Sequence, residues 1–134
     1  MRLFLDANVL FTAAHNPQGK AALVCELGRA GIWQLATSAY ALEEARRNLA
    51  RKYPDRVAGL DEVAKGMRVV ADNSDSPCPD PLPAKDCPIY RAAHACGADV
   101  LLTGDVRDFG FLMNAPEEAN GLTVQTVADF LAGL

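Results

Sequence analysis

Short apolar runs alternate with longer amphipathic segments along most of this chain. A short apolar run suits a strand buried on both faces, whereas apolar residues three and four positions apart suit a helix with one inward face. The pattern predicts strands at 2–5, 33–36, 67–71, 100–103 and 122–125, and helices at 20–30, 38–52 with Ser38 as cap, 55–65, 88–96, 106–113 and from Thr126 onward. Repeated alternation of strand and helix predicts a parallel sheet covered on both faces.

We therefore expect an α/β fold, a three-layer α/β/α sandwich with a central, mostly parallel sheet. A chain of 134 residues, half of them hydrophobic, can bury one core but is short for two. We expect a single domain over residues 1–134. Five of the eight prolines lie between residues 73 and 88, which forbids a regular helix and favours a stiff, extended loop within that domain.

Acidic residues recur where predicted strands end and predicted helices begin. In a parallel sheet these positions share one edge, at which the crevice for a ligand opens. Asp108 follows Asp105 by one helical turn, so their carboxylates can converge. The candidates are Asp6, Asp86, Asp105 and Asp108, together with Glu43 or Glu44 from the helix that follows the second strand. Both glutamates lie off the apolar stripe of that helix, so spacing does not choose between them.

Carboxylates gathered in one crevice repel each other unless a cation lies among them, so we expect the metal-free site to cost stability. Oxygen ligands without convergent histidines suit Mg²⁺ or Mn²⁺ better than zinc. Such sites serve in-line displacement at phosphorus. We expect Asn8 and Thr103 to orient the carboxylates instead of binding the metal.

Each acid also has a purely structural explanation. The alternatives are an Asx turn at Asp6 and Asn8, a helix cap at Asp86, a capping pair at Asp105 and Asp108, and a solvated helix face at Glu44. Taken singly, Asp86 and Glu44 suit the structural role better, and Asp6 and Asp105 suit either role. Their joint placement at one edge of the sheet favours a site.

The net charge of −4 looks unfavourable for a nucleic-acid substrate, because phosphate neutralisation drives such binding. Setting aside the five candidate ligands changes −4 to +1, and bound cations would offset the site itself. Lys85 and Arg107 each neighbour a candidate acid and are candidate phosphate contacts. The basic residues between 46 and 52 are typical of a solvated helix face.

The cysteines and the apolar runs bear on the compartment. Cys25, Cys78, Cys87 and Cys96 include no CxxC pair, so we expect free thiols that serve as packing residues. Asp6 interrupts the apolar stretch near the N-terminus, and no apolar run is long enough to span a bilayer. We expect a soluble, cytoplasmic protein without a membrane partner.

Four segments together resemble the PIN domain of metal-dependent ribonucleases, a family that includes VapC-like toxins. They are LDANVL at 5–10, SAYALEE at 38–44, KDCP at 85–88 and LLTGDVRDF at 101–109. Each string is short, but their order and spacing match over nearly the whole chain. The resemblance places the family's helix acid on Glu44, with Glu43 as the lesser candidate.

The resemblance implies a Mg²⁺- or Mn²⁺-dependent endoribonuclease. Its catalytic metal ligands would be Asp6, Glu44, Asp86, Asp105 and Asp108. RNA is the implied substrate. A role as the toxin of a toxin-antitoxin pair, with an antitoxin protein as partner, and assembly into a homodimer both stay open.

Two other functions also stay open. A phosphatase of the haloacid dehalogenase type begins with a strand that ends in a nucleophilic Asp, but it expects a second Asp where this chain has Asn8. A PIN-like module that binds RNA or protein without turnover is the other alternative. A lost acid would indicate such a module, whereas all five positions here carry carboxylates.

Overall fold

A five-stranded sheet forms the centre of the computed structural model, which describes residues 1–71, 75 and 77–134. The strand order is β3-β2-β1-β4-β5. The strands are β1 (Arg2–Leu5), β2 (Gln34–Ser38), β3 (Arg68–Val70), β4 (Val100–Leu102) and β5 (Thr123–Gln125). Every neighbouring pair is parallel, so the expected α/β fold with a parallel sheet is confirmed.

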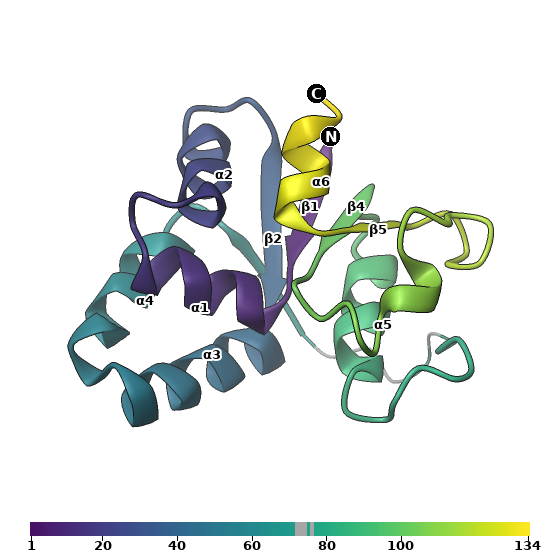
Figure 1. Cartoon of the computed structure of the whole chain (residues 1–134), viewed down its shortest axis with the longest axis horizontal. Helices are drawn as coiled ribbons and strands as arrows, with labels where there is room; N and C mark the ends of the chain where they lie inside the picture. The colour runs from purple at the N-terminus through teal and green to yellow at the C-terminus, as the bar shows by residue number, and fades with distance from the viewer. Residues whose placement is uncertain (72–74, 76) are drawn as a thin grey trace.

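Helices cover both faces of this sheet. They are α1 (Ala7–His15), α2 (Lys20–Arg29), α3 (Ala39–Lys52), α4 (Val57–Ala64), α5 (Cys87–Ala95) and α6 (Val127–Ala132), with 3-10 turns η1 (Pro54–Arg56) and η2 (Gly110–Leu112). Helices α1 to α4 lie on one side of the sheet, and α5 and η2 on the other (Figure 1). Helix α6 packs beside α2. None of the helices among the described residues is long and apolar enough to cross a membrane.

Helix α1 is missing from the sequence-based expectation. It begins directly after β1, and the Asp6 side chain caps it by accepting a hydrogen bond from the Ala7 amide. Its buried positions follow a helical spacing and belong to Ala7, Val9, Leu10, Ala13 and Ala14. The helix packs against α3 and α4, so this tertiary contact stabilises a helix of only nine residues.

The helix predicted at 106–113 is wrong. The segment contains turns at 106–108 and the short η2 instead of an α-helix. Phe109 and Leu112 are fully buried and anchor it to the core. Their spacing of three residues fits a 3-10 turn as well as an α-helix, which is why the apolar pattern misled. In contrast, the capped helix predicted after Ser38 is confirmed, with the Ser38 hydroxyl accepting from the Ala41 amide at 3.1 Å.

The proline-rich loop also differs from expectation. Residues 72–74 and 76 of the predicted loop lie outside the described residues, and the remainder contains turns at 80–81 and 84–86. A disulfide joins Cys78 to Cys87, with their Cα atoms 5.6 Å apart. The expectation of four free thiols is therefore wrong for this pair and holds for Cys25 and Cys96. The bridge closes a loop that ends at the carboxyl edge of the sheet.

Candidate metal centre

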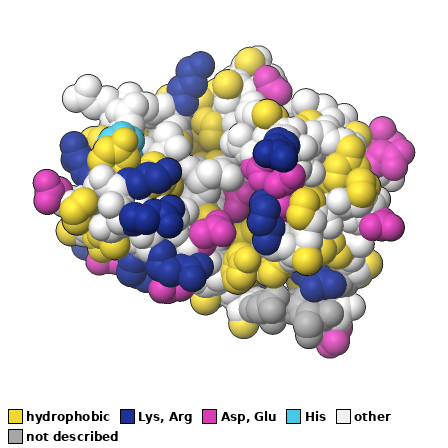
Figure 2. Space-filling model, turned by 60° about the horizontal axis from the view of Figure 1, so that its bottom comes forward, with side chains coloured by type: hydrophobic (Ala, Val, Ile, Leu, Met, Phe, Trp, Pro, Cys, Tyr) yellow, Lys and Arg dark blue, Asp and Glu magenta, His cyan; other side chains and the backbone are white. Residues whose placement is uncertain are grey.

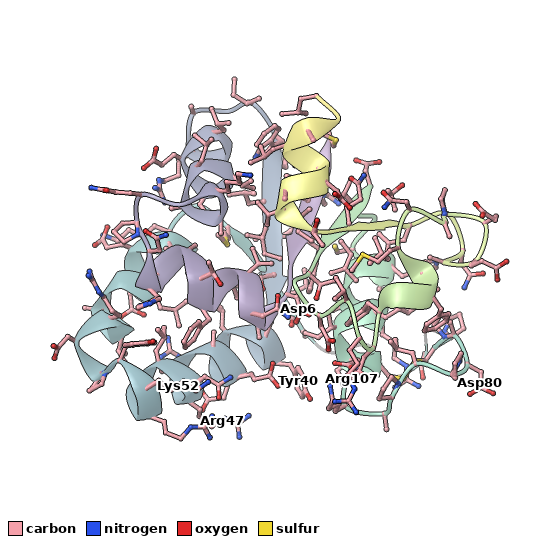
Figure 3. All side chains as sticks on the ribbon, in the orientation of Figure 1. Asp6, Tyr40, Arg47, Lys52, Asp80 and Arg107 are labelled. Carbon is pink, nitrogen blue, oxygen red and sulfur yellow. A yellow bond between two sulfur atoms is a disulfide. The ribbon has the colours of Figure 1, made fainter. Side chains whose placement is uncertain are left out.

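The carboxyl ends of β1 and β4 meet at one edge of the sheet, between α3 and α5. Figure 3 shows Asp6 at the end of β1, facing the beginning of α3 at Tyr40, with Arg107 on the opposite side. In the space-filling view, acidic side chains gather there in the middle of the face, with basic side chains on both sides of them (Figure 2). The predicted convergence of acids at this edge is therefore visible in the fold.

Three of the predicted ligands form a compact group, which we call the three-aspartate group: Asp86, Asp105 and Asp108. Each offers a carboxylate oxygen, and these oxygens lie within 4.8 Å of one another. The side chain of Asp86 is 11% exposed, that of Asp105 24% and that of Asp108 22%. Only carboxylate oxygens make up this group, which is the donor chemistry that Mg²⁺ and Mn²⁺ prefer.

Asp6 lies deeper than this group and outside it. The residue is 4% exposed, and its Oδ1 accepts from the Ala7 amide at 2.6 Å, whereas its Oδ2 accepts from the Thr103 hydroxyl at 2.7 Å. Burial raises the pKa of Asp6 to about 6, the two hydrogen bonds oppose that rise, and the charges of Glu44 and Asp86 add to it. Asp6 is thus a buried carboxylate that a nearby cation would stabilise.

Asn8 and Thr103 connect Asp6 to the turn that follows β4. The Asn8 amide nitrogen donates to Asp6 Oδ2 at 3.1 Å and to Thr103 Oγ1 at 3.3 Å. Asn8 Oδ1 accepts from the Gly104 amide at 2.7 Å, and Thr103 Oγ1 accepts from the Asp105 amide at 3.1 Å. The amide and the hydroxyl therefore fix Asp6 and Asp105 relative to each other.

The two glutamates of α3 point to different surroundings. The Glu43 side chain is 59% exposed and lies 3.7 Å from Arg46. Glu44 is half-buried, and its negative charge helps to raise the pKa of both Asp6 and Tyr40. Glu44 therefore lies close enough to Asp6 for their charges to interact, whereas Glu43 lies at the surface beside Arg46. Glu44 stands outside the three-aspartate group.

The structural explanations apply to some of these acids. Asp6 caps α1, and Asp105 Oδ1 accepts from the Asp108 amide at 3.0 Å, as a capping pair would. Asp86 occupies the N-cap position of α5 but makes no side-chain cap hydrogen bond. Its buried carboxylate points into the cluster instead, so the capping explanation does not account for Asp86.

Lys85 enters the cluster in a way that the sequence did not indicate. Its ammonium lies 2.8 Å from Asp108 Oδ2, 2.9 Å from Asp86 Oδ2 and 3.8 Å from Asp105 Oδ2. Hydrogen bonds to Asp108 and Asp86 raise the pKa of Lys85 further, and the bond from Lys85 is the main cause that lowers the pKa of Asp108. Burial still raises the pKa of Asp86 above its usual range. A positive charge therefore already lies among these oxygens.

An open groove of about 700 Å³ begins at the rim of the cluster and runs along α1 toward the start of α2. Its polar lining comes from Asn8, Thr12, Asn16, Lys20 and Asp105. Arg107 lies outside this groove, beside the cluster, where its charge contributes to lowering the pKa of Asp108. The acids thus lie beside an open groove with polar and apolar residues in its lining.

Solved structures with the same fold come from bacterial VapBC systems. VapBC2 from Rickettsia felis, bound to a DNA fragment from its promoter, matches with 15% identity and a TM-score of 0.65, covering 94% of this chain and 98% of that chain. DNA-bound VapBC from Salmonella typhimurium matches with 14% identity and a TM-score of 0.65, covering 95% and 98%. VapC20 from Mycobacterium tuberculosis, a Sarcin-Ricin loop cleaving toxin, matches with 12% identity and a TM-score of 0.55, covering 81% and 94%.

At these identities the likeness concerns the fold, which is that of the VapC toxins. None of the curated proteins matches the chain. A family model described as "PIN domain" matches residues 2–107, which include β1, the cap of α3, the aspartate before α5 and the turn after β4. The chain therefore belongs to the PIN domain family.

Proposed function

We propose that this PIN domain is an endoribonuclease that depends on Mg²⁺ or Mn²⁺. The observation that carries the proposal is the gathering of the three-aspartate group beside the buried Asp6 and the half-buried Glu44. These side chains come from four separate segments of the chain: the end of β1, helix α3, the start of α5 and the turn after β4. Gathering them is unfavourable unless a cation offsets their charge, and Lys85 already supplies one positive charge there.

Asp86, Asp105 and Asp108 would hold the metal, with Asp6 and Glu44 facing it from the inner side. A bound divalent cation supplies a nucleophilic water at neutral pH and stabilises charge on the leaving oxygen. The protein's own contribution is geometric. Asn8 and Thr103 hold Asp6 and the turn at Asp105 in place through hydrogen bonds of 2.7 to 3.3 Å, so the carboxylates need little rearrangement during the reaction.

The surroundings favour a polymeric phosphodiester over a small phosphate ester. The groove of about 700 Å³ continues from Asp105 past Thr12 to Lys20. Arg107 lies near Asp108, outside the groove, so a nucleic-acid strand can extend on both sides of the acids. The phosphatase alternative loses support because Asn8 uses its amide to hold Asp6, Thr103 and Gly104. Asn8 therefore stands where a phosphatase of the haloacid dehalogenase type needs its second Asp.

We further propose that the protein acts as the toxin of a toxin-antitoxin pair. The support is the likeness to VapC chains, which in the Rickettsia felis and Salmonella typhimurium structures are parts of VapBC assemblies. The expected partner is then an antitoxin protein. Induced expression of the chain should stop bacterial growth, and co-expression of its neighbouring antitoxin gene should restore it. Unimpaired growth with active protein present would argue against the toxin role.

The direct test of the nuclease is cleavage of end-labelled single-stranded RNA with Mn²⁺ and with chelator. We expect internal cuts with metal, none with chelator, and no hydrolysis of a small phosphate monoester under the same conditions. Intact RNA in the presence of Mn²⁺ would favour the non-catalytic binding module. Efficient monoester hydrolysis would favour the phosphatase.

A further inference from the structure

The ammonium of Lys85 lies where a metal ion would meet the three-aspartate group. It is within 4 Å of one oxygen from each of the three carboxylates, at 2.8, 2.9 and 3.8 Å. An ammonium has three donors and no acceptor, so it can satisfy several carboxylates at once. The three partners of Lys85 are the same three side chains whose oxygens lie within 4.8 Å of one another. The compactness of the group and the place of Lys85 therefore belong together.

We propose that Lys85 is a tethered counter-ion that holds the three-aspartate group together without metal and leaves it when a divalent cation binds. This inference rests on the proposed metal site and adds an internal competitor to it. An ammonium and a divalent cation repel each other, and both require the same oxygens. The two cannot occupy the group together, so binding of the divalent ion requires displacement of Lys85.

At this position the backbone is held by several contacts, whereas the side chain is exposed and flexible. The Tyr40 hydroxyl donates to the Lys85 carbonyl at 2.9 Å, and the Asp86 amide donates to the Pro83 carbonyl at 2.9 Å. The disulfide at Cys87 holds the same stretch from its other end. The Lys85 side chain itself is 63% exposed, and its four-carbon stem is flexible. The ammonium can thus leave the cluster while the backbone that carries Asp86 stays in place.

Competition from a tethered group has two measurable consequences. In the metal-free protein, the ammonium of Lys85 offsets the repulsion among the three carboxylates, so removing its charge should lower the stability of the metal-free state. Metal affinity falls, because part of the binding free energy is used to displace Lys85. The displaced ammonium remains tethered next to the cluster, where an RNA phosphate would be in reach.

The test compares the wild-type chain with Lys85→Met, which keeps most of the length of the side chain and removes its charge. Isothermal titration with Mn²⁺ should give about tenfold tighter binding for K85M, and its melting midpoint in chelator should fall below that of wild type. Lys65→Met is the matched control: Lys65 is 68% exposed and pairs with Glu62 at 2.9 Å, away from the cluster. Both measurements should leave the control unchanged.

The outcomes separate this inference from the proposed function. If wild type and K85M bind Mn²⁺ with equal affinity, or K85M binds it more weakly, the counter-ion role is overturned and the metal site stands. If neither protein binds Mn²⁺, the metal site itself is overturned, and the competitor with it.

A second measurement uses the unchanged chain, so it holds even if K85M folds poorly. The side-chain ammonium of Lys85, labelled with ¹⁵N and assigned by its loss in Lys85→Arg, should show a resonance protected from hydrogen exchange in chelator. Saturating Mg²⁺ should shift that resonance and speed its exchange toward that of a solvated lysine. A resonance that Mg²⁺ leaves unmoved would overturn the proposal.

Discussion

The inner and the outer half of the acidic crevice are stabilised by different means. Asp6, in the inner half, is buried and held by hydrogen bonds from Thr103, Asn8 and the Ala7 amide. The three-aspartate group, in the outer half, is partly exposed and held by the ammonium of Lys85. Neutral donors with fixed positions keep their geometry when a metal binds or leaves. A flexible cation stabilises the metal-free state and can withdraw, so preorganisation belongs to the inner half and exchange to the outer half.

The largest expected effect breaks the inner half. Asp6→Asn removes a buried charge that faces Glu44 and Asp86, so cleavage of RNA with Mg²⁺ should fall by about 10³-fold or more, which corresponds to about 4 kcal/mol. The fold should persist, because Asn can still accept from the Ala7 amide and cap α1. The measurement is a single-turnover cleavage rate. Asp61→Asn, which changes an exposed partner of Arg46, is the control and should cleave like wild type; cleavage near wild-type rate by Asp6→Asn would refute the assignment.

The next effect is the pH dependence of stability that Asp6, in the inner half, gives to the metal-free protein. The pKa of Asp6 is raised to about 6 from 3.8, so the folded state binds this proton more tightly than the unfolded state. Stability from Asp6 is therefore complete below about pH 4 and is lost as pH rises through about 6. A rise of about two pKa units corresponds to about 3 kcal/mol in the free energy of unfolding. Urea unfolding in chelator between pH 4 and 7 should show this decline, and Asp6→Asn should flatten it; equal slopes for both proteins would contradict the buried-carboxylate account.

A third effect tests whether Asp105 in the outer half serves a metal or only a turn. Wild type at a Mn²⁺ concentration 100 times its Kd should gain about 2.7 kcal/mol of stability. Mn²⁺ should raise the thermal melting midpoint of Asp105→Asn clearly less than that of wild type. In chelator its midpoint should stay close to that of wild type, because the lost repulsion is offset by the lost contact with Lys85 at 3.8 Å. Parallel shifts of the two curves with Mn²⁺ would return Asp105 to the capping role that its bond to the Asp108 amide already shows.

The smallest effects come from the pair of glutamates on α3. Glu44→Gln should lower the cleavage rate by about 10²-fold, about 2.7 kcal/mol, because Glu44 faces Asp6. Glu43→Gln should stay within about twofold, since Glu43 is exposed and its ion pair with the surface residue Arg46 contributes little. The two variants have the same composition, so a difference reflects position alone. The reverse order of rates would move the helix ligand to Glu43.

The sequence predicted the strands, most helices and the shared edge of the acids, because apolar runs and helix caps act locally. It missed α1, a helix of nine residues that is stabilised by contact with α3 and α4. It misjudged the segment at 106–113, where two buried side chains suit either type of helix. These errors arise where packing between distant segments decides the local structure.

Within the site, the sequence named the acids but not their cation. From its place beside Asp86, the sequence suggests Lys85 only as a phosphate contact. Its bond to Asp108, 23 residues further on, cannot be inferred from neighbours in the sequence. The disulfide between Cys78 and Cys87 was missed for a similar reason, since a separation of nine residues has no distinctive spacing. Contacts that depend on how a loop closes are visible only in three dimensions.

The sheet order places β1 in the middle, with its second neighbour, β4, made late in the chain. The hydrogen bond from Thr103 to Asp6 joins residues 97 positions apart. While the chain is being synthesised, β1, β2 and β3 can pair first. Asp6 gains its hydrogen bond from Thr103 only after β4 and the turn at Asp105 have been made. The complete set of acids therefore comes together only after β4 has paired with β1, so an N-terminal fragment that ends before β4 would lack the assembled crevice.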